Sequence, residues 1–271
     1  KRFRREAKVL ATINHANVVR IFSYEVVAGC AFLVMQLVEG PSLEKRLSEP
    51  PYFTDDEAWD LLTQSVAALA CAERHQILHR DIKPGNILCE EDGDGFVYRL
   101  CDFGLARVQT EPMGRTTSAG FAMGTPAYMS PEQVKGEPLD SRSDMYGLGH
   151  TIYQALTGEI PFEDVGQKIA VILAARLHTD VYDVREKRPE TTPELAEFLL
   201  RLVARDHEQR PGSWEEIHRE LLRRKKGLKD SAGRRSVNAP EPVKAGGPGP
   251  QLLAVAVAIA LVLGVLIMAV S

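Results

Sequence analysis

The residues with the clearest chemical potential are polar and fall in three short motifs. Residues 79–86 read HRDIKPGN, so that the carboxylate of Asp81 and the amide of Asn86 are five residues apart. Residues 102–104, DFG, begin sixteen residues after that amide, and residues 130–132, SPE, come later. Carboxylate and amide oxygens are hard ligands of the kind that suit Mg²⁺. We therefore expect the three motifs to belong to one functional site.

In this order and at this spacing the motifs resemble those of the eukaryotic-like protein kinase family. Residues 130–132 stand where the family has Ala-Pro-Glu, and Glu132 lies thirty residues after Asp102. Three motifs at kinase-like spacing are too specific for a chance match. The resemblance implies an α+β fold with two lobes. It also implies transfer of the γ-phosphoryl group of ATP to Ser or Thr of protein substrates.

Phosphoryl transfer depends mainly on positioning and on stabilising negative charge, which explains the residue types. By resemblance, Asp81 would orient the substrate hydroxyl and accept its proton. Asn86 and Asp102 would hold the Mg²⁺ ions that bridge the phosphates of ATP. These three residues are the expected centre of the site.

Two further residues favour Ser/Thr over Tyr as the acceptor. Lys83 resembles the lysine that serine/threonine-specific members place near the transferred phosphate. Residues 124–129, GTPAYM, resemble the substrate-side loop of the same subgroup. The resemblance implies that Thr125 in this loop bonds to Asp81 and Lys83.

Control by phosphorylation is expected because Arg80 immediately precedes Asp81. The resemblance to the family implies that a phosphate added to the loop between residues 102 and 132 would pair with Arg80 and order that loop. The candidate acceptors are Thr116, Thr117 and Ser118.

Other residues match family positions with structural rather than catalytic roles. The family pairs the glutamate of the third motif with an arginine near the end of the domain, and Glu132 and Arg210 fit that pair. Asp144 matches the aspartate that opens the central helix and anchors the backbone of the catalytic loop.

Residues 32–40, FLVMQLVEG, resemble the strand and linker that hold the adenine of ATP. The resemblance implies a gatekeeper side chain, backbone groups that face the purine and an apolar side chain beneath it. The residues concerned are Met35, Gln36 and Val38, and Leu88.

The phosphate-binding side of the site is incomplete in this sequence. Glu6 matches the helix glutamate that pairs with a strand lysine in the family. That lysine and the Gly-rich loop would lie before Lys1, where there is no sequence to inspect. We therefore expect these residues alone to form a poor enzyme with exposed apolar surface.

The elements that must position these residues follow from hydrophobic periodicity and turn signals. A helix is expected at residues 3–13, followed by an antiparallel strand pair at 17–24 and 30–38. A long helix at 58–72, with an acidic first turn after Thr54, precedes a second strand pair. The remaining expected elements are strands at 87–89 and 96–101 and helices at 141–157, 167–176, 193–204 and 213–224. Together they form a small, partial β-containing lobe and a larger helical lobe.

Composition is typical of a globular domain, with 44% apolar residues in 271. The formal net charge of -4 gives no global reason to expect a nucleic-acid partner. The four cysteines lack CxxC spacing, which fits neither a zinc site nor a disulfide framework, so we expect a reducing cytosol. They are Cys30, Cys71, Cys89 and Cys101.

The end of the chain predicts membrane attachment. We assign residues 1–224 to the kinase domain, 225–250 to a basic and then Pro/Gly-rich linker, and 251–270 to a transmembrane helix. Residues 252–270 are an uncharged run of 19, close to the roughly 30 Å of a bilayer core. Positive flanks stay in the cytoplasm, so we expect a single-pass plasma-membrane protein with a cytoplasmic kinase domain. The positive residues are Arg223, Arg224, Lys225, Lys226, Lys229, Arg234 and Arg235.

Three functions compete for this sequence. The preferred one is a membrane-tethered signalling kinase that resembles the bacterial receptor-like kinases, towards which Gly85 and the SPEQ sequence at 130–133 lean. A pseudokinase scaffold would bind partners without catalysis, although intact Asp81, Asn86 and Asp102 argue against it. A plain membrane-anchored adaptor would require the motifs to be coincidental. A homodimer is kept open as an assembly.

Overall fold

The computed structural model describes residues 10–27, 30–93, 95–103, 126–162 and 169–237. The chain divides into two compact units, Lys1–Arg223 and Arg224–Ser271, and each is described by itself. In the described ranges no helix is both long and apolar enough to cross a membrane. Residues 251–270, predicted to form a transmembrane helix, lie outside the described residues.

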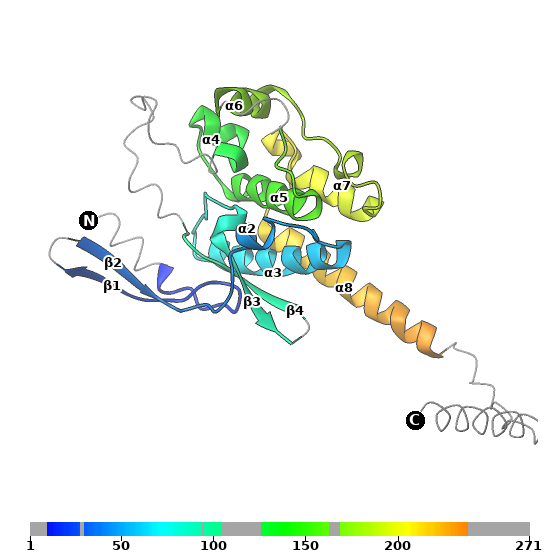
Figure 1. Ribbon diagram of the computed structural model, residues 1–271, viewed down its shortest axis with the longest axis horizontal. Coiled ribbons are helices and arrows are strands. Elements are labelled where there is room, and N and C mark those ends of the chain that lie inside the picture. The colour runs from blue at the N-terminus through cyan, green and yellow to red at the C-terminus, as the bar shows by residue number, and fades with distance from the viewer. Residues whose placement is uncertain (1–9, 28–29, 94, 104–125, 163–168, 238–271) are drawn as a thin grey trace, which may run out of the picture. The chain divides into compact units, whose positions relative to one another are not determined.

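In its described residues the first unit contains two separate two-stranded sheets and a larger set of helices (Figure 1). The strands are β1 (Ile21–Val27), β2 (Cys30–Met35), β3 (Ile87–Asp92) and β4 (Gly95–Leu100). The helices are α2 (Leu43–Arg46), α3 (Asp55–Arg74), α4 (Pro131–Lys135), α5 (Ser141–Thr157), α6 (Ile169–His178), α7 (Pro193–Leu202) and α8 (Trp214–Val237). Of α8, residues 214–223 belong to the first unit. The expected mixture of a small β-containing part and a larger helical part is therefore present.

Strands β1 and β2 form the antiparallel pair predicted from their β-rich sequences, with Ile21 opposite Met35 and Val27 opposite Cys30. Several large apolar side chains of this pair and the segment after it face solvent. Phe22 is 58% exposed and Leu37 is 82% exposed. Exposed apolar surface was expected here, and apolar patches of this kind mark surfaces that contact something else.

Strands β3 and β4 form the second antiparallel pair, from Ile87 opposite Leu100 to Asp92 opposite Gly95. The tight turn between them uses Gly93 with a positive φ of 60°, which glycine adopts without steric cost. The amide of Val19 donates to the carbonyl of Leu100 at 2.9 Å, which ties the chain before β1 to the end of β4. The second motif, which follows β4, therefore starts from a fixed point.

Helix α3 begins where the sequence indicated, with Thr54 as its N-cap. The Thr54 side chain accepts from the amide of Glu57, and the Glu57 carboxylate accepts from the Thr54 amide, which completes a capping box. The helix buries one apolar face, including Leu61, Leu62 and Val66, each fully buried. Burying a side chain of this size contributes about 1.5–3 kcal/mol, so α3 is a main part of the core.

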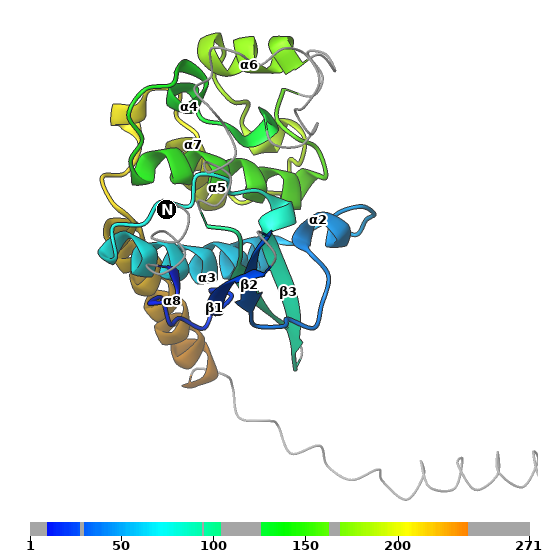
Figure 2. The same ribbon diagram turned by 90° about the vertical axis from the view of Figure 1, so that its left-hand side faces the viewer.

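Helix α5 packs against both α3 and α7, and Figures 1 and 2 show it running above α3. Two glycines allow this close packing. A Cβ atom at Gly147 would lie 3.1 Å from the carbonyl oxygen of Ile82, and one at Gly149 would collide with Val203. Helix α5 can therefore support the backbone of the first motif directly.

Several elements differ from the sequence-based expectation. Strand β1 begins at Ile21 and ends at Val27, whereas the strand was expected at residues 17–24. Helices α2 and α4, with 4 and 5 residues, are too short to show a periodic pattern. Helix α8 continues to Val237 instead of ending at Arg224, because no proline occurs before Pro240 to stop it. The helix predicted at residues 3–13 lies mostly outside the described residues.

Candidate active site

The first motif forms a loop between α3 and β3 that brings three predicted residues together. The Lys83 ammonium Nζ lies 2.8 Å from Asp81 Oδ2. The amide Nδ2 of Asn86 donates to the Asp81 carbonyl oxygen at 2.7 Å and to Asp81 Oδ2 at 3.0 Å. The short helix η1 (Pro84–Asn86) brings Asn86 back towards Asp81. The sequence prediction that these three side chains share a site is consistent with this geometry.

The two carboxylate oxygens of Asp81 have different surroundings. Both Lys83 and Asn86 bind Oδ2, whereas Oδ1 accepts no hydrogen bond from any described residue. The Asp81 side chain is 16% exposed, so it is largely enclosed but reachable. A carboxylate that is fixed through one oxygen and open at the other can accept a proton from a hydroxyl placed beside it.

Asp144 anchors the backbone of this loop from helix α5. Its carboxylate accepts from the amide of His79 at 2.7 Å and from the amide of Arg80 at 2.6 Å. Burial raises the pKa of the Asp144 carboxyl, and the two amide donors act in the opposite direction by stabilising its charged form. Arg80 holds a positive φ of 66°, a conformation that costs energy for a residue with a side chain. The anchoring role expected for Asp144 is therefore supported by direct contacts.

His79 is a supporting residue whose role the sequence did not indicate. It is fully buried, and its ring packs on Phe103 with ring centres 4.4 Å apart. Its Nδ1 accepts from the Asp81 amide at 3.4 Å, which places the ring proton on Nε2. Burial lowers the pKa of His79 to about 4, so the ring is neutral at pH 7. It therefore links the first motif to the second without adding charge.

Asp102 lies just beyond the end of β4, next to the residue that contacts Asn86. The amide of Cys101 donates to the Asn86 carbonyl at 3.0 Å. Asp102 is exposed and has a positive φ of 60°, which aspartate tolerates better than most residues. A non-glycine residue in this conformation is often found at a functional site.

The donors present fit a Mg²⁺ ion that is only partly held by protein. Asn86 uses its NH₂ group on Asp81, so its Oδ1 carries no hydrogen bond from the described residues and can face a cation. Within the described ranges no three His, Cys, Asp or Glu side chains form a metal-binding cluster. Mg²⁺ in phosphoryl-transfer sites takes one or two protein oxygens and completes its shell with phosphates and water. Asn86 and Asp102 match that donor set.

The segment predicted to hold adenine follows β2. Met35 ends β2 and lines a small hollow together with Asp102 and Phe103. The Gln36 amide donates to the Arg20 carbonyl at 2.8 Å, which leaves the carbonyl of Gln36 as its backbone group for a ligand. In the described part of the chain no hydrogen bond occupies the Val38 backbone. These positions agree with the predicted adenine contacts, which remain predictions.

The segment after Val38 is held against β3, where Leu88 lies half-buried. The Cys89 amide donates to the Pro41 carbonyl at 2.9 Å. A Cβ atom at Gly40 would collide with the carbonyl oxygen of Cys89, so only glycine fits there. This close approach fixes the linker at the edge of the site.

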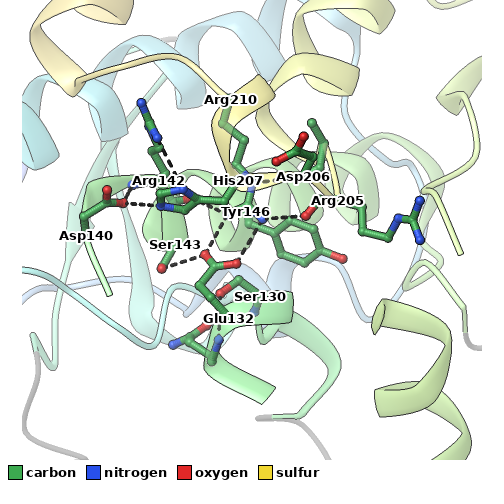
Figure 3. A network of polar contacts seen from close by, with 12 residues as sticks. Ser130, Glu132, Asp140, Arg142, Ser143, Tyr146, Arg205, Asp206, His207 and Arg210 are labelled. Carbon is green, nitrogen blue, oxygen red and sulfur yellow. Dashed lines mark hydrogen bonds and ion pairs between the residues drawn. The ribbon is translucent and has the colours of Figure 1, made fainter. Parts of the chain in front are cut away.

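The pair expected between Glu132 and Arg210 is present and buried (Figure 3). Arg210 Nη1 lies 2.7 Å from Glu132 Oε1, Nη2 lies 3.1 Å from Oε2, and the Ser143 hydroxyl donates to Oε1 at 2.7 Å. Burial alone would raise the pKa of Glu132, but the hydrogen bonds and charge of Arg210, with Ser143, lower it to about 2. The guanidinium also lies over the Tyr146 ring, 4.9 Å from its centre.

Residues next to this pair tie the third motif to the first. Ser130 and Gln133 form a capping box at the start of α4. The amide group of Gln133 also donates to the Arg80 carbonyl at 2.8 Å. Sequence reasoning missed Gln133, although the Ser-x-x-Gln spacing is a recognised helix-start signal.

Several predicted residues lie outside the described residues, so their roles stay predictions. These are Glu6, Thr125 and the candidate phosphorylation sites Thr116, Thr117 and Ser118. The described residues that adjoin Thr125, the 3₁₀ turn η3 (Pro126–Tyr128), contribute Tyr128 to a small cavity that is also lined by Asp81.

The fold and the arrangement of the site are together those of a protein kinase. The solved kinase domain of PknI from Mycobacterium tuberculosis has the same fold, with a TM-score of 0.62 and 23% sequence identity. The match covers 82% of this chain and 77% of that structure.

A family model described as the protein kinase domain matches residues 1–222, and the chain belongs to this family. The chain is 35% identical over 248 residues to serine/threonine-protein kinase pkn3 of Myxococcus xanthus, covering 88% of this chain and 45% of that protein. It is 36% identical over 205 residues to PknL of M. tuberculosis, covering 76% of this chain and 50% of that protein. The chain thus spans about half the length of these curated relatives.

Proposed function

We propose that this chain is the catalytic part of a bacterial serine/threonine protein kinase that transfers the γ-phosphoryl group of ATP to protein hydroxyls. The observation that supports this best is the arrangement of Asp81. Lys83 and Asn86 hold one of its carboxylate oxygens, and none of the described residues donates a hydrogen bond to the other. The serine/threonine kinases among its relatives support the same reaction.

Each described residue of the site has a separate role in the proposed reaction. ATP would supply the γ-phosphoryl group and leave as ADP, and Mg²⁺ held by Asn86 and Asp102 would compensate the negative charge of the phosphates. Asp81 orients the acceptor hydroxyl and takes its proton at Oδ1. Lys83 places a positive charge beside that carboxylate and, by resemblance to the family, near the transferred phosphoryl group that carries the negative charge of the transition state. Asn86 keeps Asp81 in place and, with Asp102, offers oxygen ligands to the cation.

The test is phosphate transfer by the full-length protein. Purified protein is incubated with γ-labelled ATP, Mg²⁺ and myelin basic protein as the acceptor. We expect label on Ser and Thr, none on Tyr, and no label when Mg²⁺ is removed with EDTA. ATP binding without transfer would refute the proposal and would favour the pseudokinase scaffold.

The proposal includes attachment to the plasma membrane with the kinase domain in the cytoplasm. It is supported by the uncharged run at residues 252–270 and the basic residues before it. A protein truncated after residue 250 should move from the membrane pellet to the supernatant of lysed cells. The full-length protein should stay in the pellet after a high-salt wash. The same distribution for both would contradict membrane attachment.

Regulation through the loop before η3 is a further part of the proposal. Phosphate on Thr116, Thr117 or Ser118 would pair with Arg80. Mass spectrometry of autophosphorylated protein should place phosphate on at least one of the three. No phosphate between residues 105 and 123 would contradict this. If two copies act on each other as a homodimer, wild-type protein will also label an added Asp81→Asn variant.

A further inference from the structure

Helix α6 has an inverted pattern of burial. Its sequence, IAVILAARLH, is almost entirely apolar, yet its one buried residue is Arg176, which is fully enclosed. Val171, in contrast, is 39% exposed. Helices of globular proteins normally turn apolar side chains inward and charged ones outward. The burial of Arg176, in place of one of the apolar side chains of α6, therefore has to be explained by its contacts.

Arg176 directs its guanidinium at the polar groups of two neighbouring elements. Nη1 donates to His150 Nε2 at 2.8 Å and to the Tyr146 hydroxyl at 3.3 Å, both on α5. Nη2 donates to the carbonyl oxygen of Ala127 in η3. His150 Nδ1 lies 2.9 Å from the Tyr146 carbonyl and must donate to it, so Nε2 is free to accept from Arg176. The histidine is thus neutral in a defined tautomer.

Burying the Arg176 guanidinium costs free energy, and a purely structural contact would not require a charged group. In the described ranges no carboxylate pairs with Arg176, and its charge is compensated by the carbonyl, the two α5 side chains and aromatic rings. The guanidinium carbon lies 5.7 Å from the ring centre of Tyr146 and 5.5 Å from that of Phe162. Burying a charge without an ionic partner costs free energy, which only well-placed hydrogen bonds can offset. The polar contact to Ala127 is what an apolar residue could not supply.

Ala127 lies in the turn that forms one wall of the site. Its neighbours Tyr128 and Met129 line a small cavity together with Arg80 and Asp81. The Tyr128 hydroxyl makes a second tether to this turn by donating to Gln154 of α5. Fixing the Ala127 carbonyl therefore fixes one wall of a cavity that Asp81 also lines.

We propose that Arg176 is a positioning residue that holds the 126–129 turn in the shape that receives the protein substrate. The inference rests on the proposed kinase function, because it assigns the turn to the acceptor protein rather than to ATP. Arg176 touches neither, and it acts through the backbone of Ala127.

The experiment compares Arg176→Met and Arg176→Lys with wild type in the full-length protein. Methionine keeps the apolar stem without donors, and lysine keeps one charged donor. Arg201→Met is the matched control, because Arg201 lies half-exposed on α7 and pairs with Glu220. Hydrogen exchange is measured for peptides that cover residues 126–130, and KM is measured separately for myelin basic protein and for ATP.

We expect Arg176→Met to exchange faster at residues 126–130 while α5 and α7 keep wild-type rates. KM for the acceptor protein should rise about tenfold, the size of one lost charge-assisted hydrogen bond, with KM for ATP unchanged. Arg176→Lys should recover part of both effects, and Arg201→Met should resemble wild type.

Two results would overturn the inference. Unchanged exchange at residues 126–130 would show that Arg176 does not fix the turn, whether or not the protein is a kinase. Faster exchange with an unchanged KM for the acceptor would show that the turn does not receive substrate. A wild-type protein without phosphate transfer would instead refute the proposed function, and the exchange data would still decide the role of Arg176 in the turn.

Discussion

Replacing Glu132 by glutamine isolates the energetic role of its buried pair with Arg210. The Glu132 side chain is 5% exposed and that of Arg210 is 0% exposed, so water cannot take over the lost contacts. Glutamine keeps the size and one acceptor oxygen but removes the charge. Arg210 would then keep its backbone contacts to Ala204 and Arg142 without a counter-ion.

The size of the effect follows from the pKa of Glu132, which the pair lowers from 4.5 to about 2. At roughly 1.4 kcal/mol per pKa unit, the folded state favours the charged carboxylate by about 3–4 kcal/mol. Because the folded pKa is depressed, this stability is present above pH 4.5 and is lost as the pH falls from about 4.5 to about 2. Breaking a buried pair by removing one partner typically costs about 3–5 kcal/mol, which agrees.

Urea unfolding at pH 7, followed by circular dichroism, measures the change. We expect Glu132→Gln to lower the free energy of unfolding by about 3 kcal/mol. The double variant Glu132→Gln/Arg210→Met should lose less than the sum of the single variants, because it leaves no unpaired charge. Glu215→Gln, which breaks an exposed pair with Arg74, should change stability by less than about 1 kcal/mol. A loss in Glu132→Gln as small as in this control would refute the reasoning.

Two further predictions concern other parts of the site. Burial lowers the pKa of His79 to about 4, so the unfolded state takes up a proton first as the pH falls below 6.5. Stability from this residue is therefore complete above pH 6.5 and falls by about 2 kcal/mol at pH 5. Urea unfolding at pH 7.5 and pH 5 measures the free energy of unfolding of wild type and of His79→Gln, and only wild type should show this loss at pH 5. The raised pKa of Asp144 has the opposite effect on stability, but it is present in both proteins and cancels in the comparison. An equal pH response would contradict it. A second change, Gly40→Ala, places a Cβ against the Cys89 carbonyl and should lower the thermal midpoint by several degrees, as overpacking by about 1–3 kcal/mol does. Gly95→Ala, with open space around it, is the control, and equal midpoints for the two variants would show that the linker is not packed this tightly.

Long elements with strong local signals were predictable from the sequence. The helix predicted at 141–157 has those bounds in α5, and the capped helix after Thr54 is α3. In these segments periodicity, capping residues and burial agree. The short helices α2 and α4 depend on caps and neighbours rather than on a repeated pattern, so periodicity could not reveal them.

The proximity of Asp81, Lys83 and Asn86 was predictable because the three residues follow one another at fixed spacing in a single loop. The spacing predicts that Asp81, Lys83 and Asn86 lie close together. It does not tell which carboxylate oxygen of Asp81 the side chains of Lys83 and Asn86 contact. That required the loop conformation, including the positive φ of Arg80. Arg176 shows a different limit, since an apolar pattern predicts that the charged residue of α6 faces outward. Only the packing of α6 on η3 places it inside.

The most direct test of the central claim is phosphate transfer by full-length protein in which Asp81 is replaced by asparagine. Asparagine keeps the shape and the contacts at one oxygen but cannot accept the proton of the acceptor hydroxyl. We expect wild type and a control variant at the exposed end of β3, Asp92→Asn, to label the acceptor protein with γ-labelled ATP. Asp81→Asn should bind ATP as wild type does and lose at least about a hundredfold in kcat. Equal transfer by Asp81→Asn and wild type would contradict the assignment of Asp81 as the residue that takes the proton.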